Sequence, residues 1–188
     1  MSVVGALLKN RRAGEAKLAW NLPNLSAPET LVLTSEAFGD GEAIPAEHAG
    51  KRAGGQNLSP QLAWSAPPEG TAELLLVVED TDVPMPWPFV HCVALIEPRV
   101  RELPTGGLAA RNPAVGVRVL RSGMGRGYLG PEPIKGHGPH RYVFQVFALG
   151  APAVADAAAA ASARPRALLA AIAGPVLGRG RLAGVYER

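Results

Sequence analysis

Short apolar runs separated by turn-forming residues dominate this chain from residue 31 onward. Continuous apolar runs predict buried strands, whereas alternating apolar positions predict strands with one apolar face. By these patterns, strands are predicted over 31–33, 62–64, 74–78, 90–96, 115–119 and 142–149. Many short strands between turns favour a β-rich α+β domain whose sheets pack as a sandwich.

Helical patterns are confined to the two ends of the chain. Residues 157–163 form an alanine-rich, helix-prone tract, and Pro165 suits the first turn of a further helix. One face of that C-terminal helix would carry Leu168, Leu169, Ile172, Val176 and Leu177. Pro175 interrupts the pattern and is expected to end or kink the helix.

The first part of the chain, residues 1–28, is interpreted as a short N-terminal arm, and residues 29–188 as the domain. Apolar positions within residues 3–8 would form one side of a short helix that ends before Gly14. Prolines then mark an extended segment that leads into the domain. Packing on the domain and packing on a partner subunit are both open for this arm.

Composition places the chain among single-domain globular proteins. Its 188 residues are enough for one core and short for two. The net charge is +3 and no Lys/Arg block exceeds two residues, which favours a solvated basic surface over a nucleic-acid partner. No apolar stretch is long enough for a transmembrane span, and the N-terminus lacks the apolar core of a signal peptide. We therefore expect a cytoplasmic protein.

Ionisable side chains gather at the ends of the predicted strands, beside turns rich in glycine and proline. The segments are 80–84 (Asp-Thr-Asp-Val-Pro), 89–91 (Phe-Val-His), 128–131 (Tyr-Leu-Gly-Pro) and 136–142 (Gly-His-Gly-Pro-His-Arg-Tyr). Their carboxylates, imidazoles and phenols suit a small anion-binding pocket. Simpler interpretations exist, because Asp-x-Asp-x-Pro is a common turn and a single histidine in an apolar strand is more often structural.

Metal and cofactor sites are the main chemical alternatives. His137 and His140 invite a metal hypothesis, but their Gly/Pro loop gives them no fixed helical face, and we predict no metal. The single Cys92 excludes a cysteine-only metal site and an intramolecular disulfide. Residues 125–130 match G-x-G-x-x-G, yet prolines follow instead of a long helix, so we predict no dinucleotide or other cofactor.

In order and spacing, these segments resemble the phosphatidylethanolamine-binding protein family, in its bacterial Raf-kinase-inhibitor-like branch. Residues 80–84 look like the family's D-P-D-A-P motif, and His91 stands where its strand histidine would. Residues 128–131 and 138–142 are similar to its Y-x-G-P and G-x-H-R-Y segments. The likeness covers most of the chain, from residue 31 to residue 188.

The resemblance implies an antiparallel β-sandwich with a small pocket that accepts phosphate, acetate or a phosphorylated head group. Carried over by position, the ligand-binding residues are Asp80, Asp82, Pro84, Phe89, His91, Gly130, His140 and Tyr142. We expect an aspartate of the first motif to orient and charge His91 or His140, which then faces the anion. Glu132 departs from the family pattern and adds a carboxylate near the pocket mouth.

Three functions are compatible with these features. The first, which we favour, is a non-catalytic binding protein for a small anion or phospholipid head group; the resemblance adds regulation of a kinase or protease, and a homodimer. The second is a hydrolase of a small ester or phosphoester that uses a pocket histidine as its base, although no G-x-S-x-G nucleophile elbow is present. The third is a protein-interaction module that works through residues 1–28.

Overall fold

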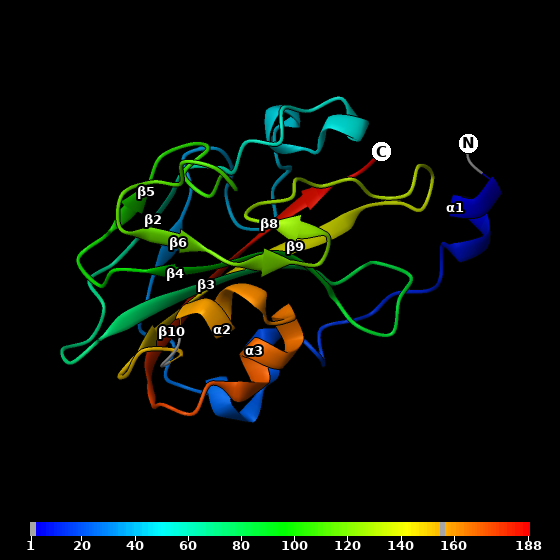
Figure 1. Cartoon of the computed structure of the whole chain (residues 1–188). Coiled ribbons are helices and arrows are strands. Elements are labelled where there is room, and N and C mark those ends of the chain that lie inside the picture. Colours follow the sequence, from blue (N-terminus) through cyan, green and yellow to red (C-terminus); the bar gives the residue numbers. More distant parts are fainter. Residues whose placement is uncertain (1–2, 155–156) are drawn as a thin grey trace.

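A five-stranded antiparallel sheet forms the centre of the computed structural model, which describes residues 3–154 and 157–188 (Figure 1). The strand order is β10-β9-β3-β4-β6. These strands are β3 (Glu73–Asp80), β4 (Phe89–Ile96), β6 (Val117–Val119), β9 (His140–Leu149) and β10 (Val176–Tyr186). The apolar runs at 74–78, 90–96 and 142–149 are therefore strands of this sheet, as the pattern predicted.

A smaller antiparallel sheet packs on one face of the large sheet and completes the predicted sandwich. Its strands are β1 (Leu33–Thr34), β2 (Leu62–Trp64) and β5 (Glu102–Leu103). Trp64 and Phe144 are buried in the core between the two sheets. A separate two-stranded ribbon consists of β7 (Arg121–Ser122) and β8 (Gly125–Arg126). The β-rich α+β fold with antiparallel sheets is confirmed.

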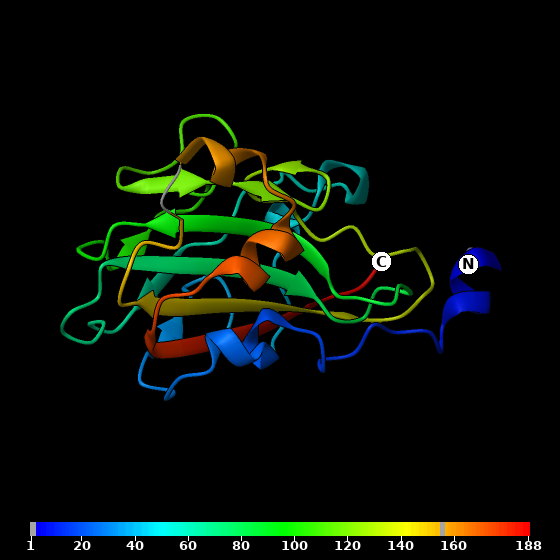
Figure 2. The same ribbon diagram turned by 60° about the horizontal axis from the view of Figure 1, so that its bottom comes forward.

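Part of the N-terminal arm and two short helices cover the other face of the large sheet (Figure 2). These elements are η1 (Ala19–Asn21), η2 (Pro23–Leu25), α2 (Ala157–Ser162) and α3 (Pro165–Ala171). Leu18, Trp20 and Leu25 are buried there in one cluster with Phe147 of β9. This part of the arm packs on the domain, one of the two arrangements that the sequence left open. The domain division at residue 28 stays a prediction.

Three further short helices lie outside the sandwich core. The first, α1 (Val3–Leu8), is the helix expected before Gly14 and lies beside the loop that leads into β9 (Figure 1). The others are η3 (Ala46–His48) and η4 (Lys51–Ala53). In the part of the chain that the structure describes, no helix has both the length and the apolar character needed to cross a membrane.

The predicted C-terminal helix is confirmed as a short helix, but it ends earlier than its apolar pattern indicated. Helix α3 ends at Ala171, before Pro175, and Val176 and Leu177 begin strand β10 instead. Strand β10 then pairs with β9 along its length. The strand predicted over 115–119 is also shorter than expected. Only Val117–Val119 (β6) joins the sheet, and Val115 is 89% exposed.

Strand β10 was not predicted because glycines occupy several of its positions. A Cβ atom at Gly178 would collide with the side chain of Thr30, and one at Gly180 with the backbone carbonyl of Leu31. The segment that enters the domain crosses β10 so closely that a side chain does not fit. Alternating apolar residues, the usual signal of a strand, are therefore missing where the packing is tightest.

A buried carboxylate joins the arm, the sheet and α3. Oε2 of Glu79 accepts hydrogen bonds from the Ala19 N–H (2.7 Å) and from Nε2 of Gln145 (2.9 Å). Its Oε1 lies 2.5 Å from the guanidinium of Arg166 on α3. Burial raises the pKa of Glu79, although Arg166 and the hydrogen bonds act in the opposite direction. This network fixes α3 and the arm against β3.

Replacement of Arg166 tests this network, because it leaves the Glu79 carboxylate buried without its cation. We expect Arg166→Ala to lower the free energy of unfolding by roughly 3 kcal/mol, the usual cost of removing one partner of a buried pair. Urea denaturation at pH 7 measures the loss. Arg164→Ala, at an exposed neighbouring arginine, is the matched control and should change stability by less than about 0.5 kcal/mol. Equal effects of the two substitutions would show that the pair does not stabilise the fold.

Candidate functional site

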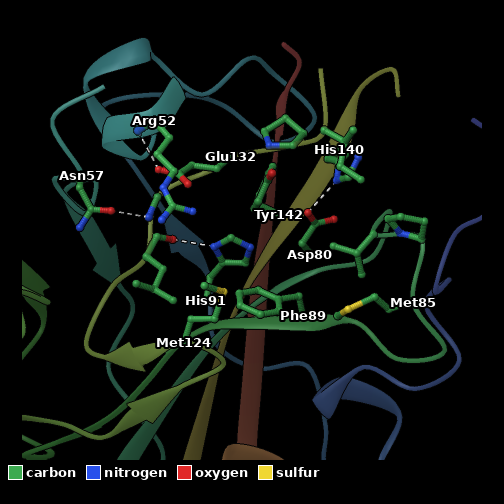
Figure 3. Close-up of a pocket in the computed structure, with 16 residues that line it drawn as sticks. Arg52, Asn57, Asp80, Met85, Phe89, His91, Met124, Glu132, His140 and Tyr142 are labelled. Atoms are coloured by element: carbon green, nitrogen blue, oxygen red, sulfur yellow. Dashed lines mark hydrogen bonds and ion pairs between the residues drawn. The ribbon is translucent and has the colours of Figure 1, made fainter. Parts of the chain in front are cut away.

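A cavity of about 490 Å³ opens where β3 ends and β4 and β9 begin (Figure 3). Seven of the predicted site residues line it, namely Asp80, Pro84, Phe89, His91, Gly130, His140 and Tyr142. The eighth, Asp82, lies outside this lining. The fold therefore brings the separate sequence segments to one cavity, as a shared pocket requires.

Strand pairing explains this convergence. Asp80 pairs with Phe89 of β4 on one side and with Tyr142 of β9 on the other. At this end the β3–β4 register shifts and leaves His91 without a partner on β3. Bulges of this kind bend a strand and re-aim a side chain. His91 consequently lies on the cavity wall together with Asp80 and Tyr142 (Figure 3).

Asp80 begins a buried chain of hydrogen bonds. Its Oδ2 lies 2.7 Å from Nδ1 of His140, and Nε2 of His140 lies 2.7 Å from Nδ1 of His137. Nε2 of His137 lies 2.8 Å from the carbonyl oxygen of Leu8, the last residue of α1. Because a carbonyl oxygen only accepts, Nε2 of His137 carries the proton of that bond. The cavity wall is thereby tied to the N-terminal helix.

The proton count of this chain determines its charge. Three hydrogen bonds need three protons, one more than two neutral imidazoles supply. The extra proton compensates the Asp80 carboxylate, so the Asp80–His140–His137 chain carries no net charge. Both ring nitrogens of His140 are used within the protein, which leaves none for a ligand. Across residues 3–154 and 157–188, no three His, Cys, Asp or Glu side chains are grouped so as to hold a metal.

His91 differs from His140 because one of its ring nitrogens is free. Its Nδ1 donates to the carbonyl oxygen of Leu129 over 2.6 Å, which fixes a proton on Nδ1. Nε2 has no hydrogen-bond partner in the part of the chain that the structure describes. Burial lowers the pKa of His91, although the nearby Asp80 carboxylate opposes this shift. His91 is therefore neutral at pH 7, with Nε2 as a hydrogen-bond acceptor.

Tyr142 presents the second free polar group. Its hydroxyl is buried, and no hydrogen bond of good distance and angle reaches it among the described residues, although the Asp80 carboxylate lies near enough to attract its proton. Burial and the Asp80 carboxylate raise the pKa of Tyr142 above its usual range, so the hydroxyl keeps its proton and can donate. The backbone N–H of Gly130, by contrast, already donates to Oδ1 of Asn57 over 2.8 Å.

The wall opposite Asp80 was not foreseen from the sequence. Arg52 and Asn57 line it together with Glu132, which was expected only near the mouth (Figure 3). The Arg52 backbone N–H donates to Oε1 of Glu132 over 2.9 Å, and a Cβ at Gly50 would collide with that carboxylate. The only signal in the sequence is a Gly-rich stretch, which indicates a loop without indicating what the loop lies against.

Asp82 contacts the arm instead of the cavity. Its Oδ1 lies 2.8 Å from Arg12, and its Oδ2 accepts from the backbone N–H (2.8 Å) and Nε (3.2 Å) of Arg141. Burial alone would raise the pKa of Asp82, but these hydrogen bonds outweigh burial and lower that pKa to about 2. Asp82 anchors residues of the arm, and its part in ligand binding stays a prediction.

Comparison with known proteins agrees with the resemblance seen in the sequence. Residues 34–187 match the model of the phosphatidylethanolamine-binding protein family. The chain is 34% identical over 157 residues to a UPF0098 protein of Aquifex aeolicus, a match that covers 82% of this chain and 86% of that protein. LppC of Mycobacterium tuberculosis, named as a candidate lipoprotein, is 37% identical over 166 residues, or 86% of this chain and 74% of LppC.

A solved structure supports the same assignment. YbcL of Escherichia coli, described as a new member of the mammalian PEBP family, superposes with a TM-score of 0.74 and 28% sequence identity. The match covers 84% of this chain and 98% of YbcL. The family resemblance and the fold that it implied are thus both confirmed.

The lowered pKa of Asp82 predicts how stability depends on pH. Its value of about 2 lies below the ordinary 3.8, so this stabilisation is complete above about pH 4 and is lost as the pH falls toward 2. We expect Asp82→Asn to lower the free energy of unfolding by about 2 kcal/mol at pH 7 and to flatten its fall below pH 4. Urea titrations at several pH values measure both effects, with the exposed Glu69→Gln as control. If the free energy of unfolding of Asp82→Asn falls below pH 4 as steeply as that of the wild type, the stabilising role of the Asp82 carboxylate is refuted.

Proposed function

This chain belongs to the phosphatidylethanolamine-binding protein family, and from that membership we propose that it is a non-catalytic protein which binds a small oxyanion in the cavity beside His91 and Tyr142. The observation that carries the proposal is the buried Tyr142 hydroxyl, which lines the cavity and lacks a well-aligned hydrogen-bond partner among the described residues. A buried polar group of this kind loses free energy unless a ligand or water satisfies it.

Electrostatics favours an anion over a cation. The Asp80 carboxylate would repel an anion if it stood alone, but its hydrogen bond to His140 compensates the charge. Arg52 contributes a permanent positive charge to the lining, and its guanidinium has no ion-pair partner within the described residues. The Glu132 carboxylate on the same wall opposes this charge, and one of its oxygens accepts the Arg52 backbone N–H. The Tyr142 hydroxyl adds a donor. Charge-assisted hydrogen bonds from such donors are the strong interactions that hold oxyanions in proteins.

Binding is a better interpretation of the cavity than hydrolysis. The described residues that line the cavity include no serine, threonine or cysteine to act as a nucleophile. His140, one of the two candidate bases, has both ring nitrogens engaged, so the hydrolase hypothesis depends on His91, whose Nε2 is free. The arm, the basis of the third hypothesis, contributes Leu18 and Leu25 to the core, which argues against a freely detachable interaction segment.

A phosphorylated head group is one source of such an oxyanion. The exposed apolar side chains Met85 and Met124 lie at the cavity and would contact a less polar part of that ligand. Regulation of a kinase or protease, a homodimer and a cytoplasmic location remain proposals that rest on the family resemblance and the sequence. One relative, LppC, is named as a candidate lipoprotein.

Tyr142→Phe tests the proposed pocket, because it removes one oxygen and keeps the ring. We expect the wild type to bind inorganic phosphate at millimolar ligand or below, and Tyr142→Phe to bind it roughly tenfold more weakly, as loss of a hydrogen bond to a charged group implies. Isothermal titration calorimetry at pH 7 measures the affinities. Tyr186→Phe, at a tyrosine outside the lining, should bind like the wild type. Absence of binding by the wild type would refute the proposed function.

A further inference from the structure

Besides the second oxygen of the Glu132 carboxylate, three polar groups of the cavity are unused by the protein itself. They are Nε2 of His91, the hydroxyl of Tyr142 and the guanidinium of Arg52. No well-aligned hydrogen bond or ion pair joins any of them to a described residue, although the Asp80 carboxylate lies near the Tyr142 hydroxyl. Figure 3 shows His91 between Arg52 on one side and Tyr142 and Asp80 on the other. A ligand that fills this space meets all three groups.

The three groups do not have the same hydrogen-bonding character. Arg52 can only donate, and Tyr142 keeps its proton and donates. His91 is the exception, because the Leu129 carbonyl holds the ring proton on Nδ1 and leaves a lone pair on Nε2. The cavity therefore offers a cation, a neutral donor and an acceptor. An oxyanion without a proton would place its oxygen lone pairs against that of His91.

We propose that the cavity selects oxyanions that carry an acidic proton, with Arg52 and Tyr142 as donors to the anion and Nε2 of His91 as acceptor of its P–OH proton. The inference rests on the proposed function and narrows it to a ligand class. Inorganic phosphate and singly protonated phosphomonoesters fit this pattern. Sulfate and phosphodiesters have no such proton and fit it poorly.

Arg52 supplies charge that the histidines do not supply. His91 is neutral, and the Asp80–His140–His137 chain has no net charge. Arg52 is thus the only side chain in the described lining that carries a permanent positive charge. Its backbone is fixed by the hydrogen bond to Glu132, which holds the loop at the cavity. Arg52 accordingly sets the affinity for an anion, and His91 sets which anion is accepted.

Inorganic phosphate and sulfate form a matched pair for the test, because near pH 7.5 both are mainly tetrahedral dianions and only phosphate has a proton to donate. We expect phosphate to bind at least roughly tenfold more tightly than sulfate, as an unsatisfied buried acceptor implies. Isothermal titration calorimetry on the full chain measures both affinities. Equal binding of the two anions would overturn the selectivity while leaving the anion pocket intact. Failure of both to bind would overturn the pocket as well.

Two further experiments test whether Arg52 and His91 are responsible for the binding and selectivity of phosphate. Arg52→Gln should weaken phosphate roughly tenfold or more, whereas Arg111→Gln, at an exposed arginine outside the lining, should not. Unchanged phosphate affinity in Arg52→Gln would remove Arg52 from the proposal. A ¹⁵N NMR spectrum of the histidines at pH 7.5 should show His91 neutral with its proton on Nδ1. A proton on Nε2 of His91 would contradict the proposal that this nitrogen accepts a hydrogen bond.

Acid pH provides a test that needs no variant. Protonation of His91 turns Nε2 into a donor, so the affinity for sulfate, which stays a dianion throughout, should rise as the pH drops below the ordinary range of histidine. The charged or titratable groups that surround His91 are Asp80, Glu132, His140, Tyr142 and Arg52. A sulfate affinity that stays constant while NMR shows His91 gaining its proton would refute His91 as the selecting group.

Discussion

The hydrogen bond between Asp80 and His140 is the interaction on which the cavity depends. It joins the last residue of β3 to the first residue of β9, and it continues through His137 to the carbonyl oxygen of Leu8. Without a proton shared along this chain, Asp80 would be an uncompensated buried carboxylate, which is costly and would repel an anion. With that proton, the Asp80 side of the cavity is neutral. An oxyanion can then be held by Tyr142 and His91 beside Asp80 and by Arg52 opposite.

The second constraint is the contact between His91 and the carbonyl oxygen of Leu129. The bulge in β4 re-aims the His91 ring, and the carbonyl fixes which ring nitrogen carries the proton. The cavity therefore differs from a simple basic pocket, because one of its central groups accepts a hydrogen bond. Selectivity among anions of similar shape follows from this acceptor, whereas affinity follows from charge and from the buried Tyr142 hydroxyl.

Local sequence patterns predicted the central strands and the segments at their ends, whereas the individual site residues came from the resemblance to the family. The apolar runs fix β3, β4 and β9, and their antiparallel pairing brings Asp80, His91 and Tyr142 together. The wall that contains Arg52 lay beyond such reasoning, since its position depends on a loop packed against Glu132 with glycine at position 50. No spacing rule reveals that contact.

Two other features show the same limit. Strand β10 carries glycines where other segments cross it, so its sequence lacks the alternation of a strand and was predicted as helix at Val176. Asp82 lies two residues from Asp80, yet Arg12 and Arg141 hold it against the arm. Motif spacing alone does not distinguish a cavity carboxylate from an anchoring one. The surrounding tertiary contacts decide it.

A crystal structure of the protein with inorganic phosphate at neutral pH is the most direct test of this arrangement. We expect one phosphate in the cavity, with its oxygens about 3 Å from the Arg52 guanidinium, the Tyr142 hydroxyl and Nε2 of His91, and with the Asp80–His140 contact retained. Phosphate bound elsewhere, or bound here with Arg52 turned away and no oxygen near His91, would contradict it.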